Sequence, residues 1–363
     1  MSPRPSRLAC IDALKAVSSQ LIVLHHLAFY GPMSDSAYSL APDVLDWLSQ
    51  YARIAVQVFL VVSGFLAARS LAPQGRLVIR QHPLTAVWRR YQKLVTPYAA
   101  AILVSIAGAA IARTWMVHDS IPAPPHLMQF LAHVLLLHNV LDVDALSAGV
   151  WYVAIDLQLF ALLVTALWLA RSVSGRGAQA GVVAVSALAV ASLFWFNRDA
   201  GWDIWAVYFF GAYGMGTLAY WASNAERSAI PLLLLGALGL AALIVDFRLR
   251  IAVALATALL LAVARRGGWL ESWPRAAAVG FFGRISYSVF LVHFPVCLIV
   301  NAVVSHLAPG NPVLNALGML FAWLASNVAG TLFYRYVESA SPFAALRALV
   351  PGARRGAPKE STT

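Results

Sequence analysis

Charged residues and cysteines are scarce in this chain of 363 residues. Charged side chains make up 11% of it, against about 25% in a typical soluble domain. Hydrophobic residues make up 61%, and the mean hydropathy is +0.73. This composition excludes a soluble globular protein and indicates a polytopic membrane protein. The two cysteines, Cys10 and Cys297, have no CxxC partner, so they neither form a zinc site by themselves nor indicate a redox compartment.

Several catalytic signatures are also missing. The sequence contains no Walker loop, no GxSxG, no HExxH and no His-x4-Asp acyltransferase pair. Acidic residues are fewer than basic ones, 15 against 26, which gives a net charge of +11. The basic residues form short blocks between apolar runs, as the positive-inside rule predicts for a membrane protein, and we therefore exclude nucleic-acid binding.

Long apolar runs fill most of the chain. Since a helix needs about 20 apolar residues to span a bilayer, ten segments are candidate spans. The sequence therefore predicts an all-α polytopic membrane protein with about ten transmembrane helices. The approximate bounds of the candidate spans are 10–30, 52–71, 94–116, 149–170, 179–197, 203–223, 229–246, 249–265, 285–306 and 314–337.

The distribution of Lys and Arg predicts the orientation. If ten spans begin and end on the same side, 19 basic residues fall on the side of the termini and five on the other. The positive-inside rule then places both termini in the cytoplasm. We expect one membrane domain over residues 1–343 and a flexible basic cytoplasmic tail over residues 344–363.

Three polar residues share one face of the first predicted span. Asp12 and Lys15 are three positions apart and can pair. The 11 positions from Lys15 to His26 make close to three helical turns, so both side chains lie on one face, about 16 Å apart along the axis. His25 points about 80° away. Ionisable groups at membrane depth are functional candidates, although a structural pairing network would explain the same stripe.

Two later spans also carry ionisable groups. Asp156 in the fourth span must have a partner or be neutral, because an unpaired carboxylate is unfavourable at that depth. It lies at a depth similar to that of His26, and we expect its carboxylate to orient that imidazole. His293 lies near the middle of the ninth span with Tyr287 below it, and the alternative interpretation of this histidine is a hydrogen-bonded structural residue.

Two features permit a structural interpretation beside a functional one. Ser63 and Gly64 in the second span are small residues that let helices approach closely. Arg90 and Lys93 belong to a basic block before the third span. This block either marks the topology or binds phosphate groups at the cytoplasmic mouth.

Metal binding is not predicted. No carboxylate or second histidine pair completes a ligand set around the four histidines of the third external region, which are His118, His126, His133 and His138. The triplet from Asp142 to Asp144 is similar to the metal-binding DxD of glycosyltransferases, but such triplets are common by chance.

Six separated patches, taken together and in order, resemble the acyltransferase-3 family of integral membrane O-acyltransferases, which includes O-acetyltransferases of surface polysaccharides. They cover nearly the whole chain from Ile11 to about Phe343. The patches are Asp12, Lys15 and His26; Gln57 to Leu66 with Ser63; Arg90, Lys93, Pro97 and Tyr98; Trp151 to Phe160 with Asp156; Gly283 to His293 with Tyr287; and Tyr334 to Phe343 with Glu338.

The chain departs from the family pattern in four places. Lys15 and Lys93 stand where Arg is usual, which keeps the charge but loses the bidentate guanidinium. Asp156 replaces Glu and is one methylene shorter. Three residues separate Glu338 from Pro342, where the family usually has fewer.

The resemblance implies an enzyme that moves an acyl group from cytoplasmic acyl-CoA, expected to be acetyl-CoA, to hydroxyls of a surface or lipid-linked glycan. It implies no bound cofactor; the expected location is the inner membrane of a prokaryote, with polysaccharide-assembly proteins as candidate partners. His26 is the expected general base and Asp156 its orienting group. Donor binding is expected at Lys15, Arg90 and Lys93, with support from Asp12, Ser63, Trp151, Tyr287, His293 and Glu338.

Three alternatives stay open at this point. His26 can instead attack the acyl donor and form an acyl-imidazole. A polyprenyl-linked glycosyltransferase or polymerase would use Asp142 and Asp144 with a metal ion. A transporter of acyl groups or glycolipids would use the polar stripe as a path without bond chemistry.

Overall fold

The computed structural model describes residues 8–78, 82–172 and 177–340, and every regular element in these ranges is helical. The predicted tail over residues 344–363, together with Pro342 and Phe343, lies outside the described residues. The long helices are α1 (Ala9–Phe29), α4 (Val56–Leu71), α5 (Pro83–Arg113), α7 (Trp151–Ser172), α8 (Gly177–Phe194), α9 (Ala206–Ala222), α10 (Ile230–Val245), α11 (Leu249–Arg266), α12 (Ala277–Leu307) and α13 (Pro312–Phe333). The shorter ones are α2 (Met33–Ala37), η1 (Tyr38–Leu40), α3 (Pro42–Tyr51), η2 (Ala52–Ala55), α6 (Leu127–Val134), η3 (Phe196–Arg198), η4 (Ala200–Trp202) and the π turn η5 (Tyr334–Glu338).

Each of the ten predicted spans coincides with one of the long helices. Among the described residues, six helical stretches are long and apolar enough to cross a membrane: Pro42–Leu71, Pro83–Arg113, Trp151–Ser172, Gln179–Arg198, Ala277–Leu307 and Pro312–Glu338. The helices α9 and α10 are shorter, with 17 and 16 residues. The prediction of an all-α polytopic membrane protein is confirmed, and membrane crossing by the four remaining helices stays a prediction.

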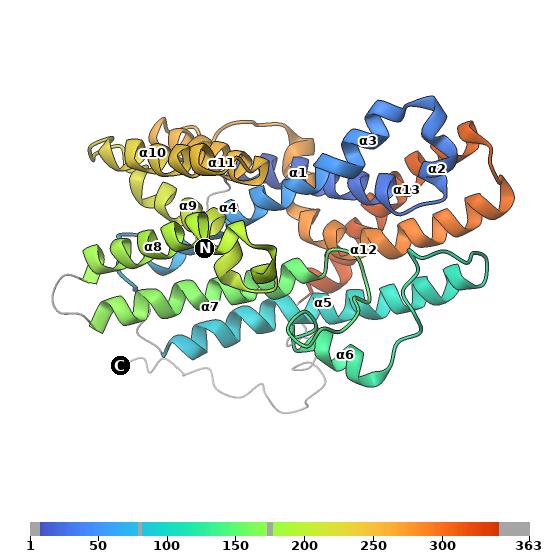
Figure 1. The fold of residues 1–363 in the computed structure, drawn as a ribbon, viewed down its shortest axis with the longest axis horizontal. Helices are drawn as coiled ribbons and strands as arrows, with labels where there is room; N and C mark the ends of the chain where they lie inside the picture. The colour runs from blue at the N-terminus through green and yellow to red at the C-terminus, as the bar shows by residue number, and fades with distance from the viewer. Residues whose placement is uncertain (1–7, 79–81, 173–176, 341–363) are drawn as a thin grey trace, which may run out of the picture.

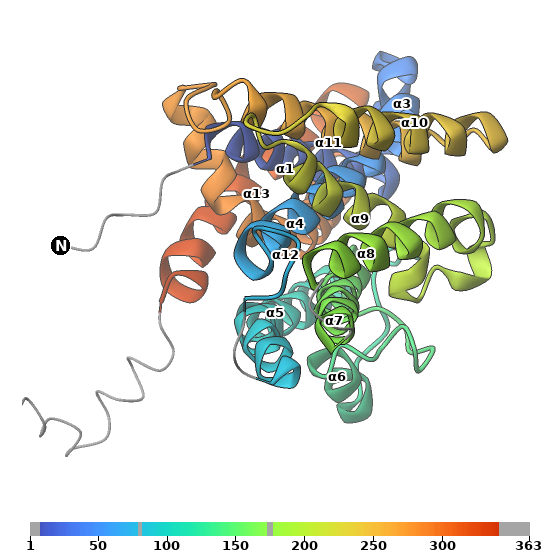
Figure 2. The same cartoon turned by 90° about the vertical axis from the view of Figure 1, so that its left-hand side faces the viewer.

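The long helices run side by side along the long axis of the molecule (Figure 1). The end-on view shows how they are grouped (Figure 2). Helix α12 packs against α1, α5 and α13, and helix α9 packs against α4, α8 and α11. Contacts of α1 with α4 and of α7 with both α5 and α9 join the two groups.

Glycines bring α4 and α9 into backbone contact. A Cβ atom at Gly64 would lie 1.9 Å from the carbonyl oxygen of Tyr213, and one at Gly216 would lie 2.0 Å from that of Val61. Only glycine permits this approach at either position. The hydroxyl of Thr217 then donates to the carbonyl oxygen of Gly64 at 3.1 Å. The close packing expected around Ser63 and Gly64 is therefore present at Gly64.

The last turn of α1, which carries His25 and His26, is fixed from outside the helix. The Nδ2 group of Asn301 in α12 donates to the carbonyl oxygen of Tyr30 at 3.1 Å. Its Oδ1 atom accepts a hydrogen bond from the backbone N–H of Met33, also at 3.1 Å. Both bonds hold the chain directly after α1, so the two histidines keep a defined position relative to α12.

Candidate functional site

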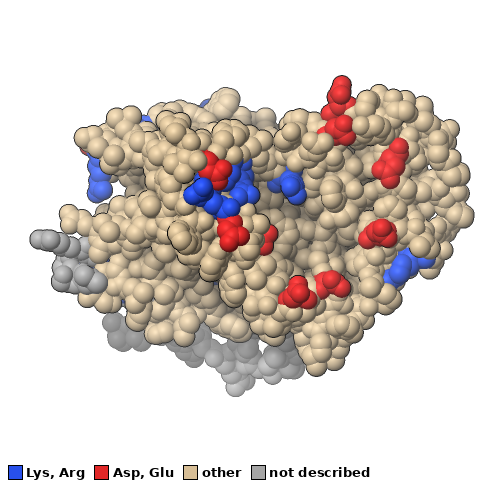
Figure 3. Space-filling model, in the orientation of Figure 1, with Lys and Arg blue, Asp and Glu red and all other residues tan. Residues whose placement is uncertain are grey.

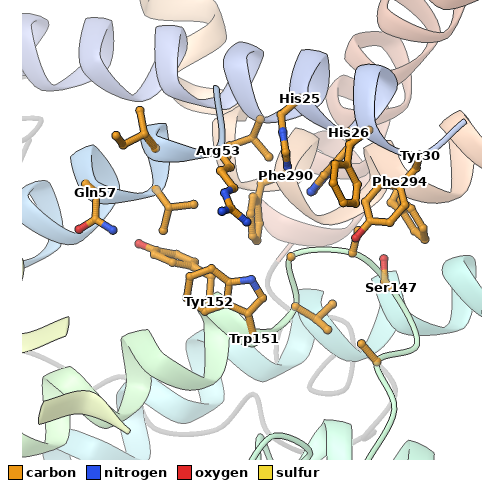
Figure 4. A pocket seen from close by; sticks show the side chains of 18 of the residues that line it. His25, His26, Tyr30, Arg53, Gln57, Ser147, Trp151, Tyr152, Phe290 and Phe294 are labelled. Carbon is orange, nitrogen blue, oxygen red and sulfur yellow. The ribbon is translucent and has the colours of Figure 1, made fainter. Parts of the chain in front are cut away.

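A cavity of about 850 Å³ lies beside the C-terminal half of α1. Its walls come from α1, the end of α3, η2, the start of α4, the loops around residues 119–122 and 145–150, the start of α7, α9, the start of α11, and α12. His25 and His26 project from α1 toward the side of the cavity formed by Trp151 and Tyr152 (Figure 4). Nine aromatic residues line it: Phe29, Tyr30, Tyr51, Trp151, Tyr152, Tyr208, Phe209, Phe290 and Phe294.

The imidazoles of His26 and His293 form a hydrogen bond between α1 and α12. Nδ1 of His26 lies 2.6 Å from Nε2 of His293, and the two rings are nearly parallel, with an interplanar angle of 5°. His26 is 7% exposed and lines the cavity, whereas His293 is fully buried behind it. The sequence placed both residues among the site candidates but did not predict this contact.

The surroundings of His293 determine where the protons of this pair lie. Nδ1 of His293 lies 2.9 Å from the carbonyl oxygen of Phe290 and 3.0 Å from that of Val289. Carbonyl oxygens only accept hydrogen bonds, so Nδ1 of His293 carries a proton and its Nε2, in the neutral ring, is an acceptor. Nδ1 of His26 must then be the donor, which leaves the lone pair of the neutral His26 ring on Nε2.

Nε2 of His26 is the atom available for chemistry. No described residue forms a hydrogen bond with it, and His26 lines the cavity. Gly149, at φ +76°, lies on this side of the ring; a Cβ atom there would be 3.6 Å from Cε1 of His26. The imidazole thus presents a basic nitrogen to an open volume while its other nitrogen is held by a second histidine. This is the arrangement of an oriented general base or nucleophile.

His25 also lines the cavity but is held differently. Its Nδ1 donates to the carbonyl oxygen of Leu48 at 3.0 Å, which ties α1 to α3. The contact gives His25 an anchoring role in the wall. By contrast, His26 has a titratable side chain, that of His293, as its hydrogen-bond partner.

Asp156 has a different partner from the expected one. Its Oδ2 accepts a hydrogen bond from Nη2 of Arg90 at 2.5 Å, and its Oδ1 has no hydrogen-bond partner in the described part of the chain. The expectation that Asp156 orients His26 is therefore wrong. Helix α1 packs against α12 and α4, whereas α7 packs against α5, α8 and α9, so similar depth in the membrane did not make the two side chains neighbours.

Arg90 is correspondingly not a free cation at the rim. Its side chain is 29% exposed, and its charge is compensated by the buried carboxylate of Asp156. The guanidinium that the sequence assigned to donor phosphates is thus already engaged within the protein. Its Nε atom has no hydrogen-bond partner among the described residues.

The two predicted donor-binding lysines lie near the end of α13. Lys15 pairs with Asp12 at 3.8 Å, as predicted. Lys15 and Lys93 both act electrostatically on Glu338 in η5, which places residues from α1, α5 and the end of α13 in one region. Glu338 also accepts a hydrogen bond from the hydroxyl of Ser288 at 2.6 Å.

The remaining predicted residues join one or other of these regions. Trp151 lines the cavity and stacks on Phe209, with ring centroids 5.4 Å apart. Ser63 lies close to Tyr152, a residue of the cavity wall. The hydroxyl of Tyr287 donates to the carbonyl oxygen of Leu94 at 3.3 Å. It also lies within electrostatic reach of the ion pair between Arg90 and Asp156, and of Glu338.

Sequence reasoning missed the arginines of the cavity. Arg53, Arg248 and Arg250 line it, yet in the sequence they were only counted as external basic residues. One signal in the sequence could have identified them. They are three of only five Lys and Arg residues on the predicted external side, where the positive-inside rule makes basic residues rare. The aromatic lining gave no such signal, because its residues come from five separate segments of the chain.

Two of the four histidines between α5 and α7 form a packed pair. The rings of His133 and His138 stack with centroids 4.2 Å apart. His133 accepts a hydrogen bond from the N–H of Leu146, and its Nδ1 donates to the carbonyl oxygen of Gln129. The described residues include no group of three His, Cys, Asp or Glu side chains that could hold a metal ion. The pair instead supports residues 145–150, which form one wall of the cavity.

Comparison with known proteins adds to this geometry. The model of a family described as an acyltransferase domain matches residues 8–334, which include the first five of the six patches. A curated relative, the regulator of hypoxia-inducible factor 1 of Caenorhabditis elegans, is 25% identical over 189 residues. These residues are 49% of this chain and 37% of the relative, so the chain covers well under half of that protein. No solved structure matches the chain.

The family match extends over most of the chain and includes the helices that carry His26, Arg90, Asp156 and His293. The predicted family membership is therefore confirmed. Acyl transfer replaces the glycosyltransferase and transporter alternatives as the activity of this chain. The protein belongs to the acyltransferase-3 family and is a multi-pass membrane enzyme that transfers acyl groups.

Proposed function

We propose that this enzyme is an O-acyltransferase that moves an acyl group, expected to be acetyl, from cytoplasmic acyl-CoA to a hydroxyl of a surface or lipid-linked glycan. The observation that carries the proposal is the lone pair on Nε2 of His26. The hydrogen bond from Nδ1 to His293 leaves this lone pair on the side of a cavity large enough for a saccharide unit.

In a direct transfer, His26 acts as the general base. The acceptor hydroxyl attacks the thioester carbonyl, Nε2 of His26 takes the hydroxyl proton, and the thiolate of CoA leaves and receives that proton. A positioned base of this kind typically contributes about 10²- to 10⁴-fold to the rate. The bond to His293 keeps the imidazole in the required tautomer.

In a two-step transfer, the same nitrogen is the nucleophile. Nε2 of His26 attacks the thioester carbon, the thiolate of CoA leaves, and the proton on Nδ1 passes to Nε2 of His293. The product is a neutral acyl-imidazole beside a protonated His293, whose Nδ1–H still donates to the carbonyls of Val289 and Phe290. The acceptor oxygen then attacks the acyl carbon, and the proton on Nε2 of His293 returns to Nδ1 of His26 as the acyl group leaves the imidazole. The hydroxyl proton neutralises the thiolate of CoA. This route explains how a cytoplasmic donor serves an external acceptor.

The lining of the cavity supports a saccharide as acceptor. Aromatic rings such as Trp151 and Phe209 offer flat apolar faces, and Gln57 and Asp203 supply polar groups at the edges. A cavity that combines apolar walls with a few polar side chains orients a bound molecule while burying most of its surface. The rings of a sugar have apolar C–H faces and polar edges, and fit such walls.

The two ends of the molecule support the proposed orientation. Lys15 near the start of α1 acts electrostatically on Glu338 at the end of the last helix, so the first and last helices share an end. On the face seen in Figure 3, acidic side chains gather toward the other end, where α2, α3 and α6 lie. We therefore propose cytoplasmic termini in a prokaryotic inner membrane, with Lys15 and Lys93 on the side of the donor phosphates.

The proposed function is tested on the glycans of the host cell. Mass spectrometry and proton NMR would compare cells with the intact gene, without it, and with His26→Ala. We expect both altered strains to lose an ester-linked acyl group while the sugar backbone stays the same. His306→Ala, an exposed histidine on α12 whose ring contacts Trp115, is the matched control and should retain the ester. A changed backbone, or glycans that keep every ester, would contradict the proposal.

A further inference from the structure

Three arginines lie on the wall of the cavity, and the protein neutralises one of them. Nε of Arg248 lies 3.4 Å from Oδ2 of Asp246, and its side chain is only 9% exposed. Its other nitrogens donate to Oδ1 of Asn197 at 2.8 Å and to the carbonyl oxygen of Leu193 at 2.9 Å. Arg248 is thus a structural residue that ties α11 to the end of α8.

Arg250 is positioned by neutral groups. Its Nη2 donates to the carbonyl oxygen of Asn197 at 2.6 Å, its Nε donates to Oδ1 of the same residue at 3.2 Å, and its guanidinium carbon lies 5.0 Å from the centre of the Tyr208 ring. None of these contacts compensates the positive charge. Among the described residues, Arg250 takes part in no ion pair.

Arg53 is the least engaged of the three. It is exposed, it extends from η2 into the cavity, and it forms neither a hydrogen bond nor an ion pair with any described residue (Figure 4). Its charge acts on His25, which places the guanidinium close to the histidine side of the cavity. Asp119 and Asp203 also line the cavity, but neither pairs with Arg53 or Arg250 in the described part of the chain.

A guanidinium without a carboxylate partner, beside a wall of aromatic rings, is a recognition element for an anion attached to an apolar ring face. Resting on the proposed function, we infer that the acceptor is an acidic saccharide whose negative group is bound by Arg53, with Arg250 as a second cation on the same cavity. The negative group is the carboxylate of a sugar acid or a phosphate linked to the sugar. Arg53 would hold it while Nε2 of His26 acts on a hydroxyl.

The inference is tested first by binding, which does not depend on catalysis. Isothermal titration calorimetry on the full chain in lipid nanodiscs would compare a uronic-acid oligosaccharide with its methyl ester, which has the same sugar backbone and one more methyl group per carboxyl but no charge. A sugar phosphate with its neutral parent sugar would form the second pair. We expect the charged member of one pair to bind tighter, by roughly 10- to 100-fold, which is the usual contribution of a charge-assisted hydrogen bond. The pair that shows the difference identifies the carboxylate or the phosphate as the recognised group.

Three variants test whether Arg53 causes the difference in affinity between charged and neutral ligands. Arg53→Gln should remove the preference for the charged member, and Arg53→Lys should restore part of it, because charge is kept and the bidentate geometry is lost. Arg113→Gln removes an arginine at the C-terminal end of α5 that does not line the cavity, and it should retain the preference. Equal affinity for charged and neutral members in both pairs, failure of both charged members to bind, or an unchanged preference in Arg53→Gln would overturn the inference.

Acyl transfer from radiolabelled acetyl-CoA to the same saccharides separates this inference from the proposed function. Selective binding without acyl transfer would support the recognition of an acidic saccharide but contradict the proposed acyl transfer to a glycan. Transfer at equal rates to charged and neutral acceptors, with no effect of Arg53→Gln, would leave the proposed function standing and contradict the role of Arg53.

Discussion

His26 donates a hydrogen bond from Nδ1 to Nε2 of His293 across 2.6 Å, and the second histidine is fixed in turn by two backbone carbonyls of α12. A neutral imidazole thus occupies the place that a carboxylate often takes beside a catalytic histidine. It brings no negative charge into the membrane interior, where an uncompensated charge is unfavourable. It still selects one tautomer of His26.

The tautomer is tested by substitution of His293. In His293→Ala, Nδ1 of His26 loses its acceptor, and kcat should fall by about 10²- to 10⁴-fold, the range of a misoriented or absent general base. His293→Gln offers an amide oxygen to the same N–H and should recover part of the loss. Acetyl-CoA turnover by purified protein measures both. Equal activity of the Ala and Gln variants would indicate that the hydrogen bond has no orienting role.

The two adjacent histidines of α1 should respond differently to truncation. His26→Ala removes Nε2 from the cavity and should abolish acyl transfer. His25→Ala removes the bond to the carbonyl of Leu48, and should lower the free energy of unfolding by about 0.5–1.5 kcal/mol while retaining most of kcat. Initial rates and thermal unfolding in detergent separate the effects. Loss of turnover in both variants at equal stability would shift the catalytic role toward His25.

The ion pair between Arg90 and Asp156 should behave as a unit. Arg90→Met leaves the buried carboxylate without its cation and should destabilise the protein by about 3–5 kcal/mol. The double variant with Asp156→Asn removes the orphaned charge, so it should be more stable than Arg90→Met alone. Thermal unfolding of the two single variants and the double variant gives the coupling energy. Strictly additive losses would show that the pair contributes no coupling.

Backbone contact between α4 and α9 makes Gly64 sensitive to a single methyl group. Gly64→Ala would place Cβ 1.9 Å from the carbonyl oxygen of Tyr213, so the helices must move apart. We expect the free energy of unfolding to fall by about 1–3 kcal/mol. Gly236→Ala is the matched control in α10, where no atom beyond the neighbouring backbone of the same helix lies within 4 Å of the added Cβ. We expect the control to unfold at or slightly above the temperature of the parent protein. Similar losses in both variants would show that the close approach of Gly64 to Tyr213 is not the cause, because Ala favours a helix more than Gly does at both positions.

The histidine pair outside the membrane spans should make stability depend on pH. Burial, with a smaller effect of His133, lowers the pKa of His138 from 6.5 to about 4. The unfolded chain therefore binds a proton at higher pH than the folded one, so this contribution to stability is full above about 6.5 and is lost as pH falls toward about 4. His138→Phe keeps a ring on His133 and should weaken the pH dependence. Thermal unfolding between pH 7.5 and 5 measures this dependence. If the unfolding temperature of the parent and of the variant changes equally with pH, groups other than His138 cause the dependence.

Local patterns in the sequence were sufficient to predict the class of membrane protein, the positions of the long helices and the family. Hydropathy over about 20 residues reports a property of each segment alone, so all ten predicted spans coincide with helices. The pairing of Asp12 with Lys15 was predictable for the same reason, since helical periodicity places residues three positions apart on one face. The spaced motif patches were sufficient for the family, which the match over residues 8–334 confirms.

Only the tertiary structure decided which side chains from different helices meet. Depth along a helix follows from residue number, but lateral neighbours depend on how ten helices pack, and that packing is set by long-range contacts such as Gly64 against Tyr213. For this reason Asp156 faces Arg90 and not His26, and His293 takes the place expected for the carboxylate. The same physics explains why Arg53, one external basic residue among five in the sequence, lies in the cavity beside the histidines.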